Sequence, residues 1–313
     1  MTPLRVVFLG TPDFAVPSLA ALLDAGFAVP LVVTQPDRPV GRHAAPRPSA
    51  VAAAAEARGI PIGKPATVRG NAALFAALTA ARPDAIAVVA FGRILPIEIL
   101  LLAPLGCVNV HASLLPRHRG ASPIQAAILA GDSETGVATM RMEEGLDTGP
   151  VYLERRVPIG ERETAGELSS RLAAMGGEIL VETLYGLAAG TLTGRPQAGE
   201  PSLCRPIRRE DGAVDWTRSA SELSRRLRAY TPWPGLYTFF GSERVKILEA
   251  DADTGSDSAE PGSIRLERGG LVASAGEGTV LRIQRLQRAG RMPVTGAEFA
   301  RSVELPGRFE SPR

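Results

Sequence analysis

The sequence predicts an α/β protein in which a Rossmann-like domain with a mostly parallel sheet precedes a smaller, β-rich domain. In the first two thirds of the chain, short apolar runs alternate with stretches of helical periodicity, which favours a parallel sheet covered on both faces. From residue 237 onward, aromatic and β-branched runs are separated by Gly and Ser, which favours a small barrel or sandwich. The 313 residues, 45% hydrophobic and 22% charged, are enough for two buried cores.

The N-terminal domain is expected over residues 1–189. Its predicted strands cover residues 4–9, 29–34, 85–90 and 107–110, and its predicted helices cover 15–25, 49–58, 71–81 and 164–189. Ligands of such sheets bind beyond the carboxyl ends of the strands. Because Asn109 and His111 stand at the end of the fourth predicted strand, this edge of the sheet is the expected site.

A linker is expected over residues 190–206, where Gly, Pro and Thr leave no clear period, and a C-terminal domain over 207–313. The C-terminal domain has a short predicted helix at 219–229 and predicted strands at 237–240, 245–248, 270–273 and 280–286. The acidic stretch 251–262, rich in Gly and Ser, is expected to be a solvated loop.

Charge is distributed unevenly along the chain. Residues 1–204 carry 17 Lys and Arg against 18 Asp and Glu, a net charge of −1, whereas residues 205–313 carry 18 against 15, a net charge of +3. The overall net charge of +2 selects no class of partner, but the C-terminal excess is compatible with an anionic one. Lys64 and Lys246 are the only lysines, which fits an Arg-rich compositional bias better than a functional selection.

Cysteine usage and hydropathy point to a cytoplasmic protein. Cys107 and Cys204 are far apart and form no Cys-x-x-Cys motif, so neither a disulfide nor a zinc framework is expected. The chain enters an apolar strand directly, without the basic region of a signal peptide. No run approaches the ~20 apolar residues of a membrane helix, so no membrane association is expected.

The common nucleotide and metal signatures do not occur. The turn at residues 10–12 lacks the Gly-x-Gly-x-x-Gly pattern of dinucleotide binding, and Pro12 has no backbone N–H for a phosphate. No Gly-x-x-x-x-Gly-Lys-Ser/Thr motif is present either. Among the three histidines, His111 and His118 lack a clear third ligand, so no metal is expected.

An amide, an imidazole and a carboxylate are the candidate catalytic groups. Asn109 and His111 end a predicted strand, and Asp147 lies in the segment Gly-Leu-Asp-Thr-Gly at residues 145–149. Each alone has a structural interpretation, as a strand-end turn residue, a buried histidine or a turn cap. Together, with no nucleophilic Ser or Cys beside them, they are suited to stabilising a carbonyl addition and moving protons.

The segment around these residues resembles the 10-formyltetrahydrofolate-dependent formyltransferase family. Matching motifs are Asn-Val-His at 109–111, Ser-Leu-Leu-Pro-Arg-His-Arg-Gly at 113–120 and Gly-Leu-Asp-Thr-Gly at 145–149. Further blocks at 8–15, 35–39, 88–92 and 215–216 are similar to the branch of the family that acts on methionyl-tRNA. Ordered blocks from residue 8 to about residue 240, in a chain of matching length, make the resemblance specific.

The resemblance implies transfer of a formyl group from the co-substrate 10-formyltetrahydrofolate to the α-amine of methionyl initiator tRNA, for translation initiation. Asn109 and His111 are then expected to donate to the oxyanion, and Asp147 to orient His111 and help remove the amine proton. Neither a metal nor a covalent enzyme intermediate is required. The residues expected to contact the folate, for which ordinary turn or core packing is the alternative, are Ser113, Leu114, Leu115, Pro116, Phe91 and Gly92.

Arginines in two regions are expected to contact the tRNA. The proline-rich loop 35–48 carries Arg38, Arg42 and Arg47, although His43-Ala44-Ala45 stands where the family often has adjacent lysines. The C-terminal domain resembles the family's OB-like β-barrel, whose arginines would follow the phosphate backbone. Each of these also has a plain interpretation as a solvated charge; they are Arg205, Arg208, Arg209, Arg285, Arg288 and Arg291.

Three other functions stay open. The nearest is a folate-dependent formyltransferase acting on a small amine, such as glycinamide ribonucleotide or an amino sugar nucleotide, which would require neither the C-terminal domain nor the arginine loop. A non-catalytic RNA- or folate-binding module would leave the amide, imidazole and carboxylate unexplained. A nicotinamide oxidoreductase is disfavoured by the glycine pattern. A monomer is expected.

Overall fold

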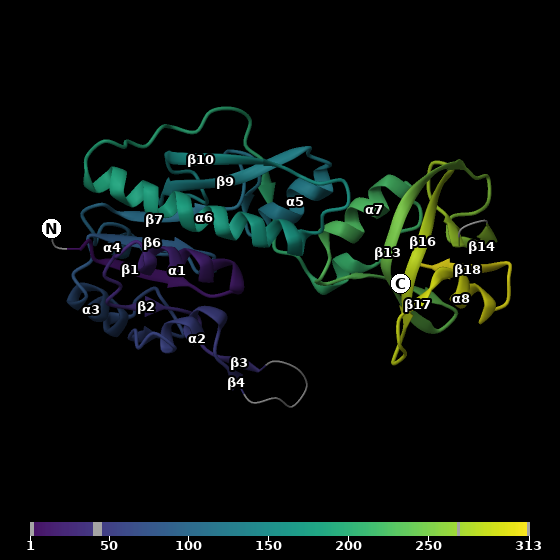
Figure 1. Cartoon of the computed structure of the whole chain (residues 1–313), viewed down its shortest axis with the longest axis horizontal. Helices are drawn as coiled ribbons and strands as arrows, with labels where there is room; N and C mark the ends of the chain where they lie inside the picture. The colour runs from purple at the N-terminus through teal and green to yellow at the C-terminus, as the bar shows by residue number, and fades with distance from the viewer. Residues whose placement is uncertain (1–2, 40–45, 268–269, 312–313) are drawn as a thin grey trace. The chain divides into compact units, whose positions relative to one another are not determined.

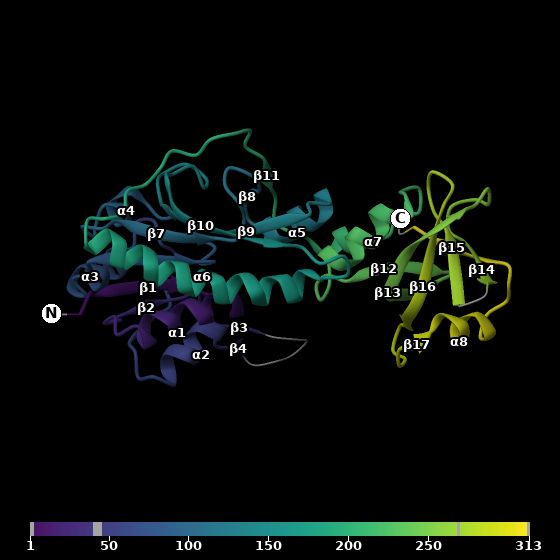
Figure 2. The same cartoon turned by 45° about the horizontal axis from the view of Figure 1, so that its top comes forward.

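The computed structural model describes residues 3–39, 46–267 and 270–311 (Figure 1 and Figure 2). Contacts between residues divide the chain into two compact units. The N-terminal unit comprises Met1–Pro123, Glu134–Pro158 and Ser169–Arg205, and the C-terminal unit comprises Ile124–Ser133, Ile159–Leu168 and Pro206–Arg313. Two short stretches that precede residue 206 therefore belong to the C-terminal unit.

A seven-stranded sheet with the order β10-β9-β7-β6-β1-β2-β5 forms the N-terminal unit. The strands are β1 (Val6–Gly10), β2 (Val32–Val33), β5 (Ile62–Gly63), β6 (Ala85–Val89), β7 (Cys107–His111), β9 (Glu134–Arg141) and β10 (Val151–Pro158). The first five run parallel, whereas β9 runs antiparallel to both of its neighbours, β7 and β10. The prediction of a mostly parallel, Rossmann-like sheet is thus confirmed.

Helices pack against both faces of this sheet, which is why β1 and β6 are apolar throughout. All five residues of β1, β6 and β7 are buried. One face packs on α3 (Ala72–Ala80) and α4 (Ile97–Leu100), through a cluster that includes Leu78, Ile99 and Cys107. The other face packs on the long α6 (Ala165–Ala188), next to α1 (Val16–Asp24). The remaining helix of this sheet is α2 (Ala50–Glu56), which Ser49 caps through the backbone N–H of Ala52.

Two adjacent glycines let α6 approach the sheet closely. A Cβ at Gly176 would lie 2.8 Å from Cγ1 of Val110 on β7, and one at Gly177 would lie 3.0 Å from the carbonyl oxygen of Pro17 on α1. Larger residues would push the helix away from both elements. The position of β7, which carries Asn109 and His111, therefore depends on this contact.

The C-terminal unit is an antiparallel barrel with the strand order β13-β12-β18-β14-β15-β16-β17, closed by an additional pairing of β13 with β16. The strands are β12 (Leu236–Phe240), β13 (Glu243–Ser256), β14 (Ser263–Glu267), β15 (Gly270–Ser274), β16 (Thr279–Arg288), β17 (Val294–Thr295) and β18 (Gly307–Glu310). The predicted OB-like barrel is confirmed. Its helices are α5 (Pro123–Ala130), α7 (Ala220–Ala229) and α8 (Gly296–Arg301).

Aromatic rings fill the barrel core. Trp216 stacks on Phe309 with ring centroids 5.6 Å apart, and its indole N–H donates to Oγ1 of Thr238 at 3.0 Å. Phe309 also contacts Phe240 and Phe299. The buried indole thus has both an apolar environment and the hydrogen-bond partner that it needs.

The structure corrects two sequence-based expectations. The loop 35–48 contains a short hairpin of β3 (Arg38–Pro39) and β4 (Pro46–Arg47). The prediction that 251–262 is a solvated loop is wrong for residues 251–256, because β13 continues through them. Asp251 and Asp253 on this strand pair with Arg162 and Arg282. Acidic residues that meet arginines on neighbouring elements can lie in a sheet, so their charge alone does not indicate a loop.

The predicted linker 190–206 includes a strand of its own. β11 (Leu203–Cys204) pairs in parallel with β8 (Arg119–Gly120), and Arg195 forms an isolated bridge with Val151. These residues therefore pack on the N-terminal unit. Within the residues that the structure describes, no helix has the length and apolar character needed to cross a membrane.

Replacing Phe309 by Ala should destabilise the C-terminal unit by about 3–5 kcal/mol, because a fully packed ring is removed from the barrel core. Urea unfolding followed by tryptophan fluorescence measures the loss. Leu266→Ala is the matched control, since Leu266 belongs to the same barrel but is 50% exposed; we expect a change below about 1 kcal/mol there. Equal destabilisation by the two variants would contradict this description of the core.

Candidate functional site

Asn109 and His111 lie on the same face of the sheet, at the end of β7. Successive side chains of a strand alternate between faces, so Cys107, Asn109 and His111 share one face, while Val110 meets α6 on the other. Asn109 is 9% exposed and His111 is 6% exposed. An amide and an imidazole are therefore placed side by side at a nearly dry edge of the sheet.

The imidazole of His111 is held in one tautomer. Its Nε2 lies 3.0 Å from the backbone carbonyl oxygen of His118. A carbonyl oxygen only accepts hydrogen bonds, so we infer that Nε2 carries a proton and donates it. Nδ1 of the neutral ring then keeps its lone pair, and this atom faces Oδ2 of Asp147 at 3.7 Å. Nδ1 and Oδ2 together form a site that can accept one proton.

Burial lowers the pKa of His111 below its ordinary value of 6.5, because the charged ring is poorly solvated there. The carboxylate of Asp147 and the hydrogen bond to the His118 carbonyl favour the charged ring, but burial is the larger effect. The imidazole is consequently neutral at pH 7. A neutral His111 has no spare N–H for an oxyanion until Nδ1 has accepted a proton, which refines the donor role expected from the sequence.

A tight loop brings Asp147 to His111. Asp147 has φ 51°, in the left-handed region that aspartate tolerates better than most residues. A Cβ at Gly149 would lie 1.9 Å from the carbonyl oxygen of Arg141, so only glycine permits this loop to close. Oδ2 of Asp147 accepts a hydrogen bond of 2.7 Å from the backbone N–H of Gly120. This bond orients the carboxylate towards the imidazole.

The segment 118–120 contacts both His111 and Asp147, and β11 holds this segment in place. A Cβ at Gly120 would lie 2.2 Å from the carbonyl oxygen of Cys204, so glycine is required for the close pairing of β8 with β11. The backbone N–H of His118 donates to Oγ of Ser202 at 2.8 Å. The thiol of Cys204 lies 3.4 Å from the His118 carbonyl oxygen that also accepts from His111.

Gln197 connects the loop of Asp147 to β8. Its Nε2 donates to the carbonyl oxygens of Asp147 and Gly149, each at 2.8 Å. Its Oε1 accepts from the guanidinium of Arg119 at 2.7 Å. All of its polar atoms thus bind the two segments that position the carboxylate.

Sequence reasoning missed Gln197, Ser202 and Cys204, which all lie in the stretch interpreted as a linker. That stretch carries no periodicity and no motif, and its contribution follows only from its pairing with β8. Gly120 stood inside a recognised motif, but its N–H, rather than a side chain, is the group that contacts Asp147. In the part of the chain that the structure describes, no group of three or more His, Cys, Asp or Glu side chains is arranged to hold a metal ion.

The side-chain amide of Asn109 is left without a hydrogen-bond partner among residues 3–39, 46–267 and 270–311. Its nitrogen carries two N–H donors, and it stands two residues before His111 on the same face. An almost buried amide without a partner costs free energy. A bound oxygen that develops negative charge would satisfy it.

The predicted folate segment 113–116 forms a closed turn. The hydroxyl of Ser113, which is fully buried, donates to the carbonyl of Arg117 at 2.6 Å, and the Leu115–Pro116 peptide bond is cis. Leu115 and Pro116 are buried, whereas Leu114 is partly exposed. The Ser113 side chain is therefore engaged within the protein, and a ligand would meet backbone groups and Leu114 here.

The predicted wall residues Phe91 and Gly92 are tied to the arginine loop by Gln35. The carbonyl of Phe91, a residue that is 2% exposed, accepts from Nε2 of Gln35 at 2.8 Å. Gly92 has φ +72°, and a Cβ there would lie 2.6 Å from the same Nε2. Oε1 of Gln35 accepts from Arg38 at 2.7 Å. The wall and the loop are thus one connected structure.

Arg38 and Arg47 lie directly opposite each other on β3 and β4, and both are exposed. Like charges in this position repel each other, and an anion between them would relieve the repulsion. Arg42, which was expected to act with them, lies outside the described residues.

The other predicted arginines are spread over both units. Arg205 is exposed at the end of the N-terminal unit, and Arg208 and Arg209 are exposed in the C-terminal unit, as are Arg285 and Arg291. Arg288 pairs with Glu243. Of the sequence-predicted groups, the structure brings together the three catalytic candidates, whereas the predicted arginines belong to two different units.

Both units match models of one protein family. The model described as formyl transferase matches residues 4–184, and the model described as formyl transferase, C-terminal domain, matches residues 206–304. Over 304 residues the chain is 48% identical to a methionyl-tRNA formyltransferase of Anaeromyxobacter dehalogenans strain 2CP-1, with 96% of this chain and 97% of the relative covered. A methionyl-tRNA formyltransferase of Gluconobacter oxydans strain 621H is 46% identical, with 97% and 98% covered.

Solved structures share the fold at low sequence identity. WlaRD, a sugar 3N-formyl transferase crystallised with dTDP and 5-N-formyl-THF, matches with a TM-score of 0.66 and 17% identity, covering 93% of this chain and 100% of that one. A methionyl-tRNA formyltransferase from Clostridium thermocellum matches with a TM-score of 0.55 and 15% identity, covering 90% and 98%. At these identities the likeness establishes the fold alone.

We expect the pKa of His111, followed by NMR of the imidazole protons, to lie below 6.5 and to fall further in Asp147→Asn. Burial favours the neutral ring, and the substitution removes the negative charge that favours the protonated one. Because the chain has three histidines, the spectrum of His111→Gln identifies the signal. A pKa above 6.5, or a rise in Asp147→Asn, would be incompatible with the geometry.

Proposed function

The chain belongs to the formyl transferase family, with both of its domains present, and from this premise we propose how it carries out its reaction. We propose that it transfers the formyl group of 10-formyltetrahydrofolate to the α-amine of methionyl initiator tRNA. Relatives of 45–48% identity over nearly the whole chain are named methionyl-tRNA formyltransferase. The observation that carries the site assignment is the neutral His111 of fixed tautomer beside Asp147. On the same face lies the amide of Asn109, which has no partner in the part of the chain that the structure describes.

The reaction forms a bond between the methionyl nitrogen and the formyl carbon and breaks the bond from that carbon to N10 of the folate. The lone pair of the neutral amine attacks the carbon, and the π electrons of the carbonyl move to its oxygen. When the tetrahedral intermediate collapses, the electron pair of the C–N10 bond leaves with N10, which takes up a proton. The enzyme therefore has to stabilise one oxyanion and move one proton from the attacking nitrogen to N10.

Asn109 is the proposed oxyanion donor. Its unpaired N–H groups are already positioned in a dry environment, so they need no reorganisation when charge develops on the oxygen. A single preorganised donor of this kind contributes about 3–4 kcal/mol to the stability of the transition state. This role also accounts for the cost of an almost buried amide without a partner.

His111 and Asp147 are the proposed proton carriers. Nδ1 of His111 has the free lone pair, and the carboxylate of Asp147, 3.7 Å away, stabilises the imidazolium that forms when Nδ1 accepts the amine proton. The protonated Nδ1 can then donate a hydrogen bond to the oxyanion or transfer the amine proton to N10. Because Gly120 holds Oδ2 and Gln197 holds the backbone of the loop, the carboxylate stays in place through the cycle.

The folate is proposed to lie along the turn 113–116 and the wall at 91–92. A folate-derived formyl donor is consistent with the family, and WlaRD was crystallised with a formylated folate. The turn offers backbone groups and Leu114, since its other side chains are engaged in the protein. The backbone carbonyl of Phe91 already accepts a hydrogen bond from Gln35 and is therefore occupied. The buried side chain of Phe91 is proposed to support this wall by packing.

The initiator tRNA is proposed to contact Arg38 and Arg47. These exposed arginines face each other across a two-residue ladder, where a bridging phosphate would offset their repulsion. Gln35 connects Arg38 to Gly92 and thus to the proposed folate wall. The arginines of the barrel add further positive charge along the RNA backbone.

Single-turnover formyl transfer by Asn109→Ala should be slower by about 100- to 1,000-fold, with little change in the binding of either substrate, because the lost donor acts on the oxyanion. Asn71→Ala is the matched control. Asn71, the only other asparagine, caps α3 by accepting from Leu74, so this variant loses about 1 kcal/mol of stability and keeps its rate. A near-normal rate for Asn109→Ala would remove Asn109 from the mechanism.

Incubation with 10-formyltetrahydrofolate and charged initiator tRNA should give formyl-methionine, whereas charged elongator methionyl-tRNA should react more slowly. Glycinamide ribonucleotide, the small-amine control, should not be formylated, because it has no phosphodiester backbone for Arg38, Arg47 or the barrel. Formylation of glycinamide ribonucleotide without any activity on tRNA would contradict the proposed acceptor.

A further inference from the structure

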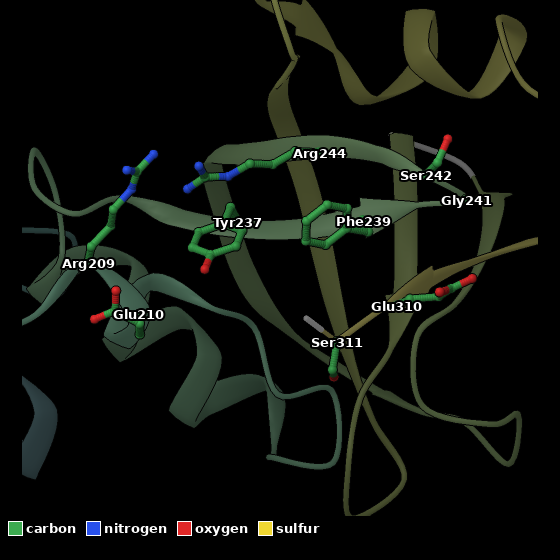
Figure 3. A pocket seen from close by; sticks show the side chains of 9 residues that line it. All are labelled: Arg209, Glu210, Tyr237, Phe239, Gly241, Ser242, Arg244, Glu310 and Ser311. Carbon is green, nitrogen blue, oxygen red and sulfur yellow. The ribbon is translucent and has the colours of Figure 1, made fainter. Parts of the chain in front are cut away.

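An open cavity of about 650 Å³ lies in the C-terminal unit (Figure 3). It is formed by the first strands of the barrel, by β18, and by the 3-10 turn η2 (Arg209–Gly212) that precedes them. The proposed chemistry uses none of its aromatic or acidic residues. The lining residues are Arg209, Glu210, Tyr237, Phe239, Gly241, Ser242, Arg244, Glu310 and Ser311.

Two aromatic rings form one wall of the cavity. Tyr237 and Phe239 alternate along β12 with Leu236 and Thr238, which are fully buried in the barrel, so both rings are directed outward. The rings meet edge to face, with centroids 6.3 Å apart. Both are only partly buried. The barrel thus carries a pair of aromatic rings on its outside, where they add nothing to its core.

A guanidinium group lies over this aromatic wall. Arg244 stands opposite Phe239 on β13, and its guanidinium carbon lies 3.7 Å from the centroid of the Tyr237 ring (Figure 3). Its Nε is buried and has no hydrogen-bond partner within the described residues. The adjacent Arg288 pairs with Glu243, whereas Arg244 pairs with no carboxylate in that same part of the chain. The remaining donors of its guanidinium, on Nη1 and Nη2, form no hydrogen bond within the described residues and are therefore available to a ligand.

Carboxylates complete the cavity without neutralising its cations. Glu210 and Glu310 line the same space as Arg209 and Arg244, yet within residues 3–39, 46–267 and 270–311 neither carboxylate forms an ion pair with either arginine. A site for phosphate alone would be weakened by carboxylates at its wall. A planar ligand that carries both amino donors and acceptor atoms would use both kinds of group.

We propose that this cavity binds an unpaired nucleobase of the tRNA, stacked on the platform of Tyr237, Phe239 and Arg244. Every base has a π face that stacks on aromatic rings and guanidinium planes. The exocyclic amino group of a purine or cytosine would donate to Glu210 or Glu310, and its ring nitrogen or carbonyl would accept from Arg244 or Arg209. The proposal rests on tRNA being the substrate, and it adds a contact to a base where phosphate contacts alone were expected.

The test measures binding of initiator tRNA to the full-length protein over a range of salt concentrations. Tyr237→Leu keeps an apolar side chain on the strand but removes the ring, and we expect it to weaken binding by about tenfold. The slope of log Kd against log salt should stay unchanged, because no phosphate contact is lost. Tyr237→Phe retains the ring and should bind like the unmodified protein. Arg244→Gln should also bind about tenfold more weakly.

Arg301→Gln is the control for general loss of positive charge, because Arg301 is exposed at the end of α8 in the same unit. Binding by Tyr237→Leu within twofold of the unmodified protein would overturn the proposal. A fall in its salt slope of about one, as expected for a lost phosphate contact, would also overturn it. The far-UV circular dichroism spectrum and the urea unfolding midpoint of Tyr237→Leu should match those of the unmodified protein, which shows that the variant is folded.

A competition experiment with free mononucleotides distinguishes two possible occupants of the cavity, a base within the tRNA and a free nucleotide. Adenosine, guanosine, cytidine and uridine monophosphates at millimolar concentration should not displace tRNA, because a single base lacks the rest of the RNA contacts. Displacement by one of them, lost in Tyr237→Leu, would assign the cavity to a free nucleotide and overturn the RNA assignment. If the unmodified protein formylated no tRNA at all, the proposed function would fail, whereas normal formylation with unaltered Tyr237→Leu binding would refute this cavity alone.

Discussion

One hydrogen bond connects the chemistry of this protein to its architecture: the bond from Nε2 of His111 to the backbone carbonyl of His118. It leaves Nδ1 as the ring nitrogen that can take a proton, next to Asp147. The carbonyl holds its position because the backbone N–H of His118 binds Ser202, 84 residues later in the chain. The close pairing of β8 with β11 then places the N–H of Gly120 on the Asp147 carboxylate. The hydrogen bond between His111 and His118 therefore depends on residues 202–204, which lie far away in the sequence.

Burial is the second physical condition of the site. Because β7 is covered on both faces, the polar residues at its end lose almost all contact with water. Desolvation lowers the pKa of His111 and so favours its neutral form, and the Asn109 amide has no hydrogen-bond partner among the described residues. Both conditions cost stability in the free protein. Both suit the proposed acyl transfer, in which one group stabilises new negative charge and another accepts a proton. The proposed RNA contacts of the barrel are less buried, since Tyr237, Phe239 and Arg244 are only partly covered.

Much of the fold and the chemical core of the site could be predicted from the sequence. Apolar runs marked β1 and β6, and helical periodicity marked α1, α3 and α6, because burial on both faces leaves a direct trace in composition. The prediction failed where tertiary partners override composition, as at Asp251 and Asp253, whose charges are matched by Arg162 and Arg282. It also missed β11, because a two-residue strand in a Gly- and Pro-rich stretch has no local signal.

The sequence by itself determined the class of fold and singled out the three candidate groups at 109, 111 and 147, since strand periodicity and side-chain chemistry are local properties. The tertiary structure alone decided the tautomer of His111, the orientation of Asp147 and the supporting role of Gln197. These follow from backbone carbonyls and N–H groups that carry no residue identity. A backbone donor can be assigned to a side chain only when the chain has folded, because every residue but proline offers the same N–H.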